Sequence, residues 1–302
     1  MIYIVFSLFF ALVLFIGNAA ASIFLGIIFA LIIKPDKSFV SLTIGTTPLQ
    51  IGIVILGATI SLPYAWSLSA NYLPWISLFV LGSFFTGLVL GKILGIHHRI
   101  AFLLSAGAAI CGGTAMAAVA PIIKAKPQEL LIAMTIVFLL NALAIIFFPI
   151  IGGYLEMTNF QFGAWSALAI HDTSSVIGSA LTYSNESAQV AATLKLGRTI
   201  WIIPLILITN WVINHQAETT KFPRFILFFI LAIILNTALN FDDQVLDLLK
   251  IASQFFLMLG LFCIGTQFKV QELKSISGKP LILALILWIM VIPSAYWLVM
   301  YL

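Results

Sequence analysis

The chain has 302 residues, of which 62% are hydrophobic and only 8% are charged, and its formal net charge is +4. A soluble protein of this length needs more polar surface, so the composition excludes a water-soluble globular domain and places the chain in a membrane. The few basic residues lie mostly in short stretches between apolar segments, so we expect membrane lipid and no nucleic acid as partners.

Cysteine usage excludes two further classes of protein. Cys111 and Cys263 both lie in apolar segments. Two such residues build neither a disulfide framework nor a four-ligand zinc site. We therefore expect no metal and no cofactor.

Apolar segments follow one another along the whole chain. A spanning helix needs about 20 mostly apolar residues. On that rule the segments lie at 1–16, 18–34, 39–61, 72–94, 99–122, 128–153, 161–182, 188–214, 223–240, 244–268 and 279–301. We predict one all-α transmembrane domain over 1–302, in which helices at about 1–94 and 223–301 frame a core of about 99–214.

Basic residues indicate which loops face the cytoplasm, because short cytoplasmic loops are enriched in lysine and arginine. They mark four such loops, with Lys34 and Lys37, Lys92 and Arg99, Lys221 and Arg224, and Lys269, Lys274 and Lys279. The uncharged loop at 64–72 and the acidic loop with Asp242 and Asp243 then lie outside.

Lys124 and Lys126 test the path of the segment 99–122. A full crossing would place both lysines outside, whereas a hairpin that dips into the membrane and returns keeps them inside. The same treatment of 161–182 puts Glu156 and Glu186 outside. The charges therefore favour two re-entrant hairpins over two full spans.

A weak internal similarity points the same way. Residues 51–60 (IGIVILGATI) resemble residues 256–266 (FLMLGLFCIGT). In the hairpin topology the two segments run in opposite directions, and the hairpins enter from opposite faces. This pattern predicts inverted repeats, as in many secondary transporters, with two broken or re-entrant helices that meet near the bilayer midplane.

Two polar breaks interrupt the apolar core, at 110–115 (ICGGTA) and 169–178 (AIHDTSSVIG). Gly112 and Gly113 permit non-helical backbone, after which Thr114 can cap a short helix. Asp172, Thr173 or Ser174 can cap a second one. Two helix N-termini that face each other would attract an anion. The alternative is that small residues here only let helices pack closely.

Lys195 and Arg198 lie three residues apart on one face of the segment 188–214. Each costs roughly 2.5–3.5 kcal/mol to insert at a helix centre, so both need compensation. Asp172 can neutralise one of them, which leaves one positive charge and His171 for an anionic solute. A purely structural salt bridge is the alternative, and Lys195 could also extend its side chain toward the interface.

His171 and Asp172 are candidates for the coupling ion. His171 can accept a proton near neutral pH, and Asp172 can carry a proton or sodium. The alternatives are hydrogen bonding for His171 and capping or pairing for Asp172. Asn141, in the middle of 128–153, either lines the path or bonds a neighbouring helix.

With these motifs the chain resembles the YeiH-type family of bacterial membrane proteins, named as sulfate exporters. The resemblance rests on 110–115 with 120–125 (APIIKA), on 163–165 (GAW) with 169–176, and on 195–204 (KLGRTIWIIP). It covers nearly the whole chain from about Asn18. It implies a multi-pass transporter of the bacterial cytoplasmic membrane, distantly similar to bile-acid symporters and cation antiporters, and a sulfur oxyanion as cargo. Some relatives carry an acidic residue where this chain has Ala120.

We therefore predict a secondary active transporter of a small anion, such as sulfate or sulfite, with a proton or sodium as the coupling ion. The alternatives are a cation transporter that uses Asp172 and a passive channel; an intramembrane hydrolase using Ser174 or Ser175 with His171 is disfavoured, so no enzyme is expected. Assembly into a homo-oligomer stays open. The predicted substrate-binding residues are Gly112, Gly113, Thr114, His171, Asp172, Thr173, Ser174, Ser175, Lys195 and Arg198.

Overall fold

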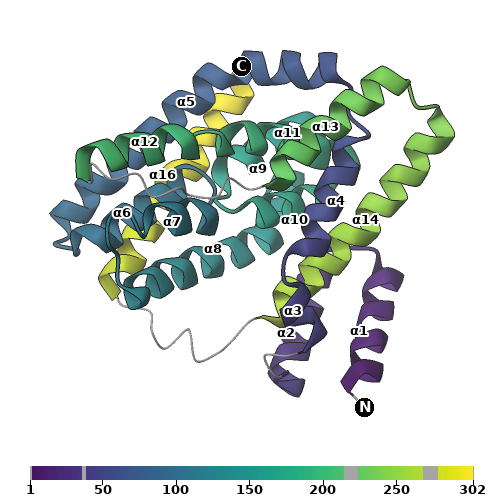
Figure 1. The fold of residues 1–302 in the computed structure, drawn as a ribbon, viewed down its shortest axis with the longest axis horizontal. Helices are drawn as coiled ribbons and strands as arrows, with labels where there is room; N and C mark the ends of the chain where they lie inside the picture. The colour runs from purple at the N-terminus through teal and green to yellow at the C-terminus, as the bar shows by residue number, and fades with distance from the viewer. Residues whose placement is uncertain (1, 36–38, 214–223, 268–277, 302) are drawn as a thin grey trace.

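A computed structural model describes residues 2–35, 39–213, 224–267 and 278–301, and this part of the chain contains helices and no strand (Figure 1). The all-α prediction is confirmed. The helices are α1 (Ile2–Ile16), α2 (Ala19–Ile33), α3 (Val40–Ile44), α4 (Thr47–Gly57), α5 (Leu62–Ile93), α6 (His98–Ala109), α7 (Gly113–Val119), α8 (Pro127–Tyr154), α9 (Asn159–Ala169), α10 (Thr173–Tyr183), α11 (Asn185–Thr199), α12 (Ile202–Ile213), α13 (Arg224–Leu239), α14 (Asp243–Thr266) and α16 (Gly278–Tyr301).

Five stretches of the described residues are long and apolar enough to cross a membrane, including α5, α8, α14 and α16. The fifth combines α11 and α12, which a short turn at Ile200 and Trp201 separates. The predicted loop at 64–72 is wrong, because α5 begins at Leu62 with Pro63 in its first turn. Proline fits that position because its missing N–H would have no partner there.

The segment 99–122, which contains the first polar break, is a re-entrant hairpin. At its two ends His97 and Arg99 both approach Glu129 in the first turn of α8, with His97 Nδ1 3.3 Å from Glu129 Oε1. The chain therefore enters through α6 and returns through α7 to the same end of the molecule. Gly107 in α6 accordingly lies beside Met116 in α7, since a Cβ on Gly107 would be 3.1 Å from Met116 Cγ. In a straight helix two residues nine positions apart would be about 13 Å apart.

The segment 161–182, which contains the second polar break, folds back in the same way from the opposite end of the molecule. The Ser187 hydroxyl at the start of α11 donates to the Asn159 carbonyl at the start of α9, at 2.8 Å. The Tyr183 hydroxyl at the end of α10 donates to the carbonyl of Met157, just before α9. Because α8 spans the molecule between the two hairpins, they approach each other from its two ends.

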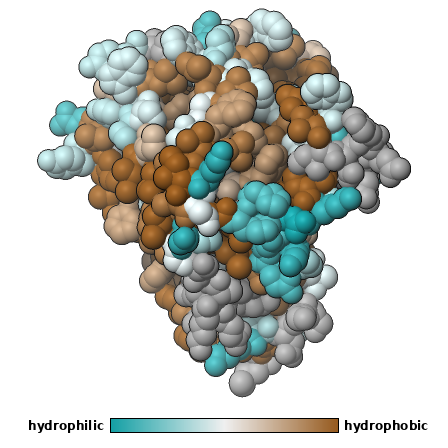
Figure 2. All heavy atoms as spheres, turned by 90° about the vertical axis from the view of Figure 1, so that its left-hand side faces the viewer, coloured by the Kyte–Doolittle hydropathy of each residue, from teal (hydrophilic) through white to brown (hydrophobic). Residues whose placement is uncertain are grey.

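This topology gathers several basic loop residues at one end of the molecule. Arg99 and Lys126 lie there beside Glu129, with Lys92, Lys124 and Lys279 close by in the same turns. Lys34 and Arg224 follow or begin helices elsewhere in the chain, whereas Lys37, Lys221, Lys269 and Lys274 lie outside the described residues. Figure 2 faces the end at which α5 leads into α6 and shows hydrophilic residues gathered on an otherwise largely hydrophobic surface. The positive-inside rule assigns this end to the cytoplasm.

The helices form two groups by their contacts. The panel group consists of α1 to α4, α13 and α14, in which α14 packs most extensively on α2 and α4. The hairpin group consists of α5 to α12 and α16, and the two groups lie on the right and left of Figure 1. Near the end that carries Glu186, two side-chain pairs join the groups: Gln189 Nε2 donates to Thr59 Oγ1 at 2.8 Å, and Gln254 Nε2 donates to Asn185 Oδ1.

Within the panel group, α4 and α14 run in opposite directions, because Gly52 lies against Leu257 and Gly260 against Leu49. These helices contain the two similar sequence segments. Their antiparallel arrangement is what inverted repeats require, and the repeat itself stays a prediction.

Replacing Gly260 with alanine is expected to destabilise the panel group. A Cβ at this position would overlap the backbone of Leu49, so α4 and α14 would have to separate. Overpacking of this kind costs about 1–3 kcal/mol, measured as a lower unfolding temperature of the purified protein. Gly153→Ala is the matched control, since a Cβ there meets no atom within 4 Å; equal unfolding temperatures for the two variants would contradict the packing described.

Candidate functional site

The tips of the two hairpins meet beside the middle of α8. A Cβ on Gly112, in the first tip, would lie 3.2 Å from Asp172 Cβ in the second tip. The backbone N–H of His171 donates to Asn141 Oδ1 at 3.3 Å, and Asn141 is central in the 28-residue helix α8. A helix of this length spans about 42 Å, so the tips meet deep within the membrane.

Gly112 makes the turn of the first tip. Its backbone angles, φ 60° and ψ −124°, belong to a region that only glycine occupies without strain. The same residue lets the backbone of Asp172 approach closely. The predicted cap by Thr114 is wrong, since Gly112 precedes α7 without a side-chain cap and Thr114 is exposed in the first turn.

Arg198 binds both hairpins. Its side chain is 1% exposed and donates to four backbone carbonyls that end α6 and α9. Nε donates to Ala109 at 2.7 Å, Nη2 to Ala108 at 2.7 Å, and Nη1 to Leu168 at 2.6 Å and Ala167 at 3.2 Å. A helix C-terminus carries a partial negative charge and unpaired carbonyls, so one guanidinium compensates two helix ends.

Lys195 lies one turn before Arg198 and is fully buried. Its Nζ donates to the carbonyl of Ile170 at 2.7 Å, so its side chain points into the second tip and not toward the interface. The expected ion pair with Asp172 is absent, because no carboxylate among the described residues lies within 4.0 Å of Lys195 or Arg198. Backbone carbonyls compensate both cations instead.

Asp172, one of the three candidates that the sequence offered, caps α10. Its Oδ2 accepts from the Ser175 backbone N–H at 3.1 Å and from the Ser175 hydroxyl at 3.3 Å. Asp172, Thr173 and Ser174 are half-buried, unlike the sealed side chains of Lys195 and Arg198. The tips therefore leave part of Asp172, Thr173 and Ser174 accessible while they enclose both cations.

The Ser175 hydroxyl donates to Asp172, and the Nδ1 atom of the buried His171 has no hydrogen-bond partner among the described residues. A nucleophile needs a base within hydrogen-bond reach, and this geometry does not provide one for Ser175.

Two residues besides the predicted substrate-binding ones contact the tips or Arg198, and the sequence analysis had singled out one of them, Asn141. Asn141 holds the second tip, and its place in the middle of an apolar segment was the available sequence signal. The ring centroid of Phe79, on α5, lies 5.8 Å from Arg198 Cζ. Nothing in the sequence distinguishes this phenylalanine from its apolar neighbours.

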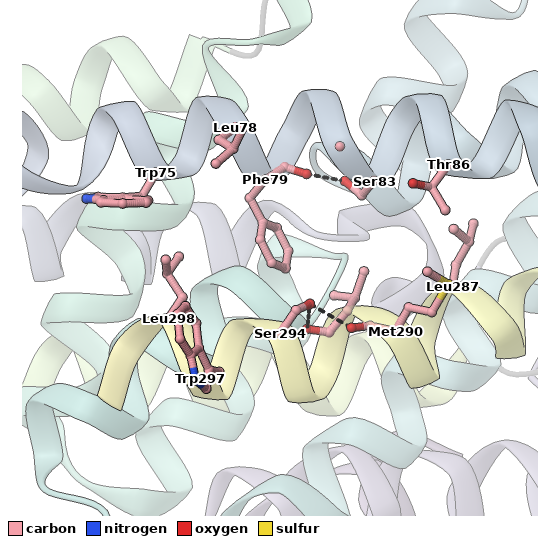
Figure 3. Close-up of a pocket in the computed structure, with 12 residues that line it drawn as sticks. Trp75, Leu78, Phe79, Ser83, Thr86, Leu287, Met290, Ser294, Trp297 and Leu298 are labelled. Carbon is pink, nitrogen blue, oxygen red and sulfur yellow. Dashed lines mark hydrogen bonds between the residues drawn. The ribbon is translucent and has the colours of Figure 1, made fainter. Parts of the chain in front are cut away.

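Phe79 also lines a cavity of about 320 Å³ between α5 and α16 (Figure 3). Hydroxyl groups in its wall bond to their own helices: Ser83 donates to the Phe79 carbonyl and Ser294 to the Met290 carbonyl, both at 2.6 Å. The wall is otherwise mostly apolar, with Trp75 and Trp297 on opposite helices toward one end. This cavity is separate from the polar tips.

The fold and the site define an all-α multi-pass membrane protein with two opposed re-entrant hairpins. The chain belongs to the family described as conserved hypothetical protein 698, whose model matches residues 2–284. Relatives named UPF0324 membrane protein occur in Bacteroides thetaiotaomicron, 38% identical over 89% of this chain and 82% of the relative, and in Porphyromonas gingivalis, 40% identical over 80% and 75%. Another, in Shewanella oneidensis, is 38% identical over 80% and 76%. No solved structure matches the chain.

Proposed function

We propose that the protein is a secondary active transporter of a small anion, which binds where the two hairpin tips meet. The observation that carries the proposal is the meeting of Gly112 and Asp172 at mid-membrane, from hairpins that enter through opposite ends. Non-helical backbone at this depth occurs where it is buried in protein or lines a cavity. Transporters place such breaks at their binding sites.

The charge balance of the tips favours an anion. Lys195 and Arg198 contribute two positive charges and Asp172 one negative charge, so the cluster has a formal surplus of one when His171 is neutral. Arg198 compensates the C-terminal ends of α6 and α9, which leaves the N-terminal end of α10 directed at the tips. An anion of unit charge would neutralise the surplus.

The sequence resemblance suggests a sulfur oxyanion, such as sulfate or sulfite, as the cargo. Its hydrogen-bond donors would be Thr114, Thr173 and Ser174, together with backbone N–H groups next to Gly113 and Thr173. Alternating access would move the hairpin group past the panel group, driven by a proton or sodium gradient. Saturation of the flux in proteoliposomes would distinguish this transporter from a passive channel.

A cation transporter is the second candidate, because one observation favours it. Asp172 is the accessible charged group of the site, whereas both cations are sealed. A proton or sodium ion entering the tips would meet this carboxylate directly. The two candidates differ in what the carboxylate does: it binds the cargo in one and the coupling ion in the other.

Replacing Asp172 with asparagine separates the two candidates. Asparagine still caps α10, so the tip is expected to keep its fold while it loses the negative charge. For an anion transporter we expect retained binding of sulfite or sulfate and uptake that no longer follows a proton or sodium gradient. Thermal shift and proteoliposome uptake are the measurements.

Asp242→Asn is the matched control, since Asp242 caps α14 in the same way at a distance from the tips, with Oδ1 2.9 Å from the Val245 nitrogen. The cation proposal would replace the anion proposal if sodium, and no anion, raised the unfolding temperature of the wild-type protein. In that case the effect of sodium should be lost in Asp172→Asn.

A further inference from the structure

Asn141 keeps a hydrogen-bond donor without a partner at the tips. Its side chain is 1% exposed, and its Oδ1 accepts the His171 backbone N–H. That N–H fixes the orientation of the amide, because only the oxygen can accept. The amide nitrogen Nδ2 then finds no partner among the described residues. Such a buried donor is costly unless another group accepts from it.

His171 supplies the complementary acceptor. Its side chain is also 1% exposed, and its Nδ1 is buried without a partner among the described residues. A neutral imidazole carries its hydrogen on one ring nitrogen and accepts on the other. We assign the hydrogen to Nε2, which makes Nδ1 the acceptor. Asp172, the next residue, adds a carboxylate.

Asn141 Oδ1 bonds the backbone N–H of His171, so the unpartnered donor of Asn141 and the unpartnered ring nitrogen of His171 both lie at the second tip. A hydroxyl oxygen can accept from Asn141 Nδ2 and donate to His171 Nδ1. An oxyanion without a proton can use only the donor, and it would place its oxygens against the Nδ1 lone pair and the Asp172 carboxylate. A site built to bond a hydroxyl strongly rejects the analogue that lacks it.

We propose that the transported anion is an oxyanion that retains a proton, such as hydrogensulfite, hydrogencarbonate or hydrogenphosphate, and that Asn141 and His171 recognise its hydroxyl group. The inference rests on the proposed anion transport and narrows its substrate class. Asn141 adds a donor that every oxyanion can use, beside those of the hydroxyls and the backbone. His171 supplies the acceptor that distinguishes protonated from proton-free oxyanions.

The test compares hydrogenphosphate with sulfate, which are tetrahedral dianions of similar size that differ in one hydroxyl. Binding to the purified full-length protein is measured by calorimetry, with hydrogensulfite as a third ligand. We expect hydrogenphosphate and hydrogensulfite to bind roughly 10-fold or more tightly than sulfate. Asn141→Leu should weaken both dianions by about 10-fold, since each loses one charge-assisted hydrogen bond.

His171→Phe keeps a ring in place but removes the acceptor, so the preference for hydrogenphosphate over sulfate should disappear. This ratio does not depend on the fraction of folded protein. Thr135→Val is the matched control, because Thr135 is on the same helix, is buried and has an Oγ1 without a partner, six residues before Asn141. It should change neither affinity.

The outcomes separate this inference from the proposed function. Sulfate that binds as tightly as hydrogenphosphate, or an Asn141→Leu variant with unchanged affinities, would overturn the inference and leave anion transport standing. The second result would mean that only water fills the space beside Asn141. A folded wild-type protein that binds none of the three anions, and is stabilised by sodium instead, would overturn both.

Discussion

Replacing Arg198 with alanine is expected to lower the free energy of unfolding by about 3–5 kcal/mol and to abolish transport. The guanidinium donates to four carbonyls at the ends of α6 and α9, so its loss leaves both helix ends buried without a partner. It also removes the positive surplus at the tips. Thermal unfolding in detergent and anion uptake by proteoliposomes measure the two effects.

Arg198→Lys separates charge from geometry, because an ammonium keeps the charge but cannot reach all four carbonyls in the plane of a guanidinium. We expect an intermediate stability for this variant. Arg224→Ala, at an exposed residue that begins α13, controls for the loss of an arginine. Stable Arg198→Ala protein with unchanged anion uptake would refute the anion proposal.

Replacing Gly112 with alanine is expected to reduce transport at least 10-fold while the protein remains folded. The backbone at φ 60° and ψ −124° would be strained by about 1–3 kcal/mol with any side chain, and the new methyl would press on Asp172. The tip would shift, and a displacement of about 1 Å can cost 10²-fold where geometry matters. Initial rates of uptake measure the effect.

Gly197→Ala is the control for this variant. Gly197 lies between Lys195 and Arg198 in α11, but a Cβ there meets no atom within 4 Å. It should transport at the wild-type rate, with slightly higher stability because alanine favours the helix. If Gly112→Ala matched it in both properties, the close approach of the tips would have no functional role.

The sequence predicted the path of the backbone well where charge and hydropathy determine it. The segment 128–153 became α8 (Pro127–Tyr154), and two lysines were enough to favour a hairpin that the Glu129 contacts now show. The start of α5 was missed because serines, tyrosines and an asparagine between Ser61 and Tyr72 lower its hydropathy. Pro63 was the signal of a helix start there.

The sequence predicted which charged residues come together at the tips, but not which groups they bond to. Sequence placed His171, Asp172, Lys195 and Arg198 together, and the structure brings all four to the tips. The sequence could not reveal that backbone carbonyls would bind the two cations. Every residue has a backbone carbonyl, so the residue type does not show which carbonyls will accept. The predicted pairing with Asp172 failed for this reason.

The contacts between the panel group and the hairpin group have a mechanical consequence. Gln189 with Thr59 and Gln254 with Asn185 are neutral amide and hydroxyl pairs, each worth only about 0.5–1.5 kcal/mol net. Water can replace either partner at the outer surface with little loss. At the outer rim these weak polar pairs therefore join the two groups, and deeper inside the protein it is the apolar contact of Leu261 with α10 at Gly178 that any relative movement would have to break.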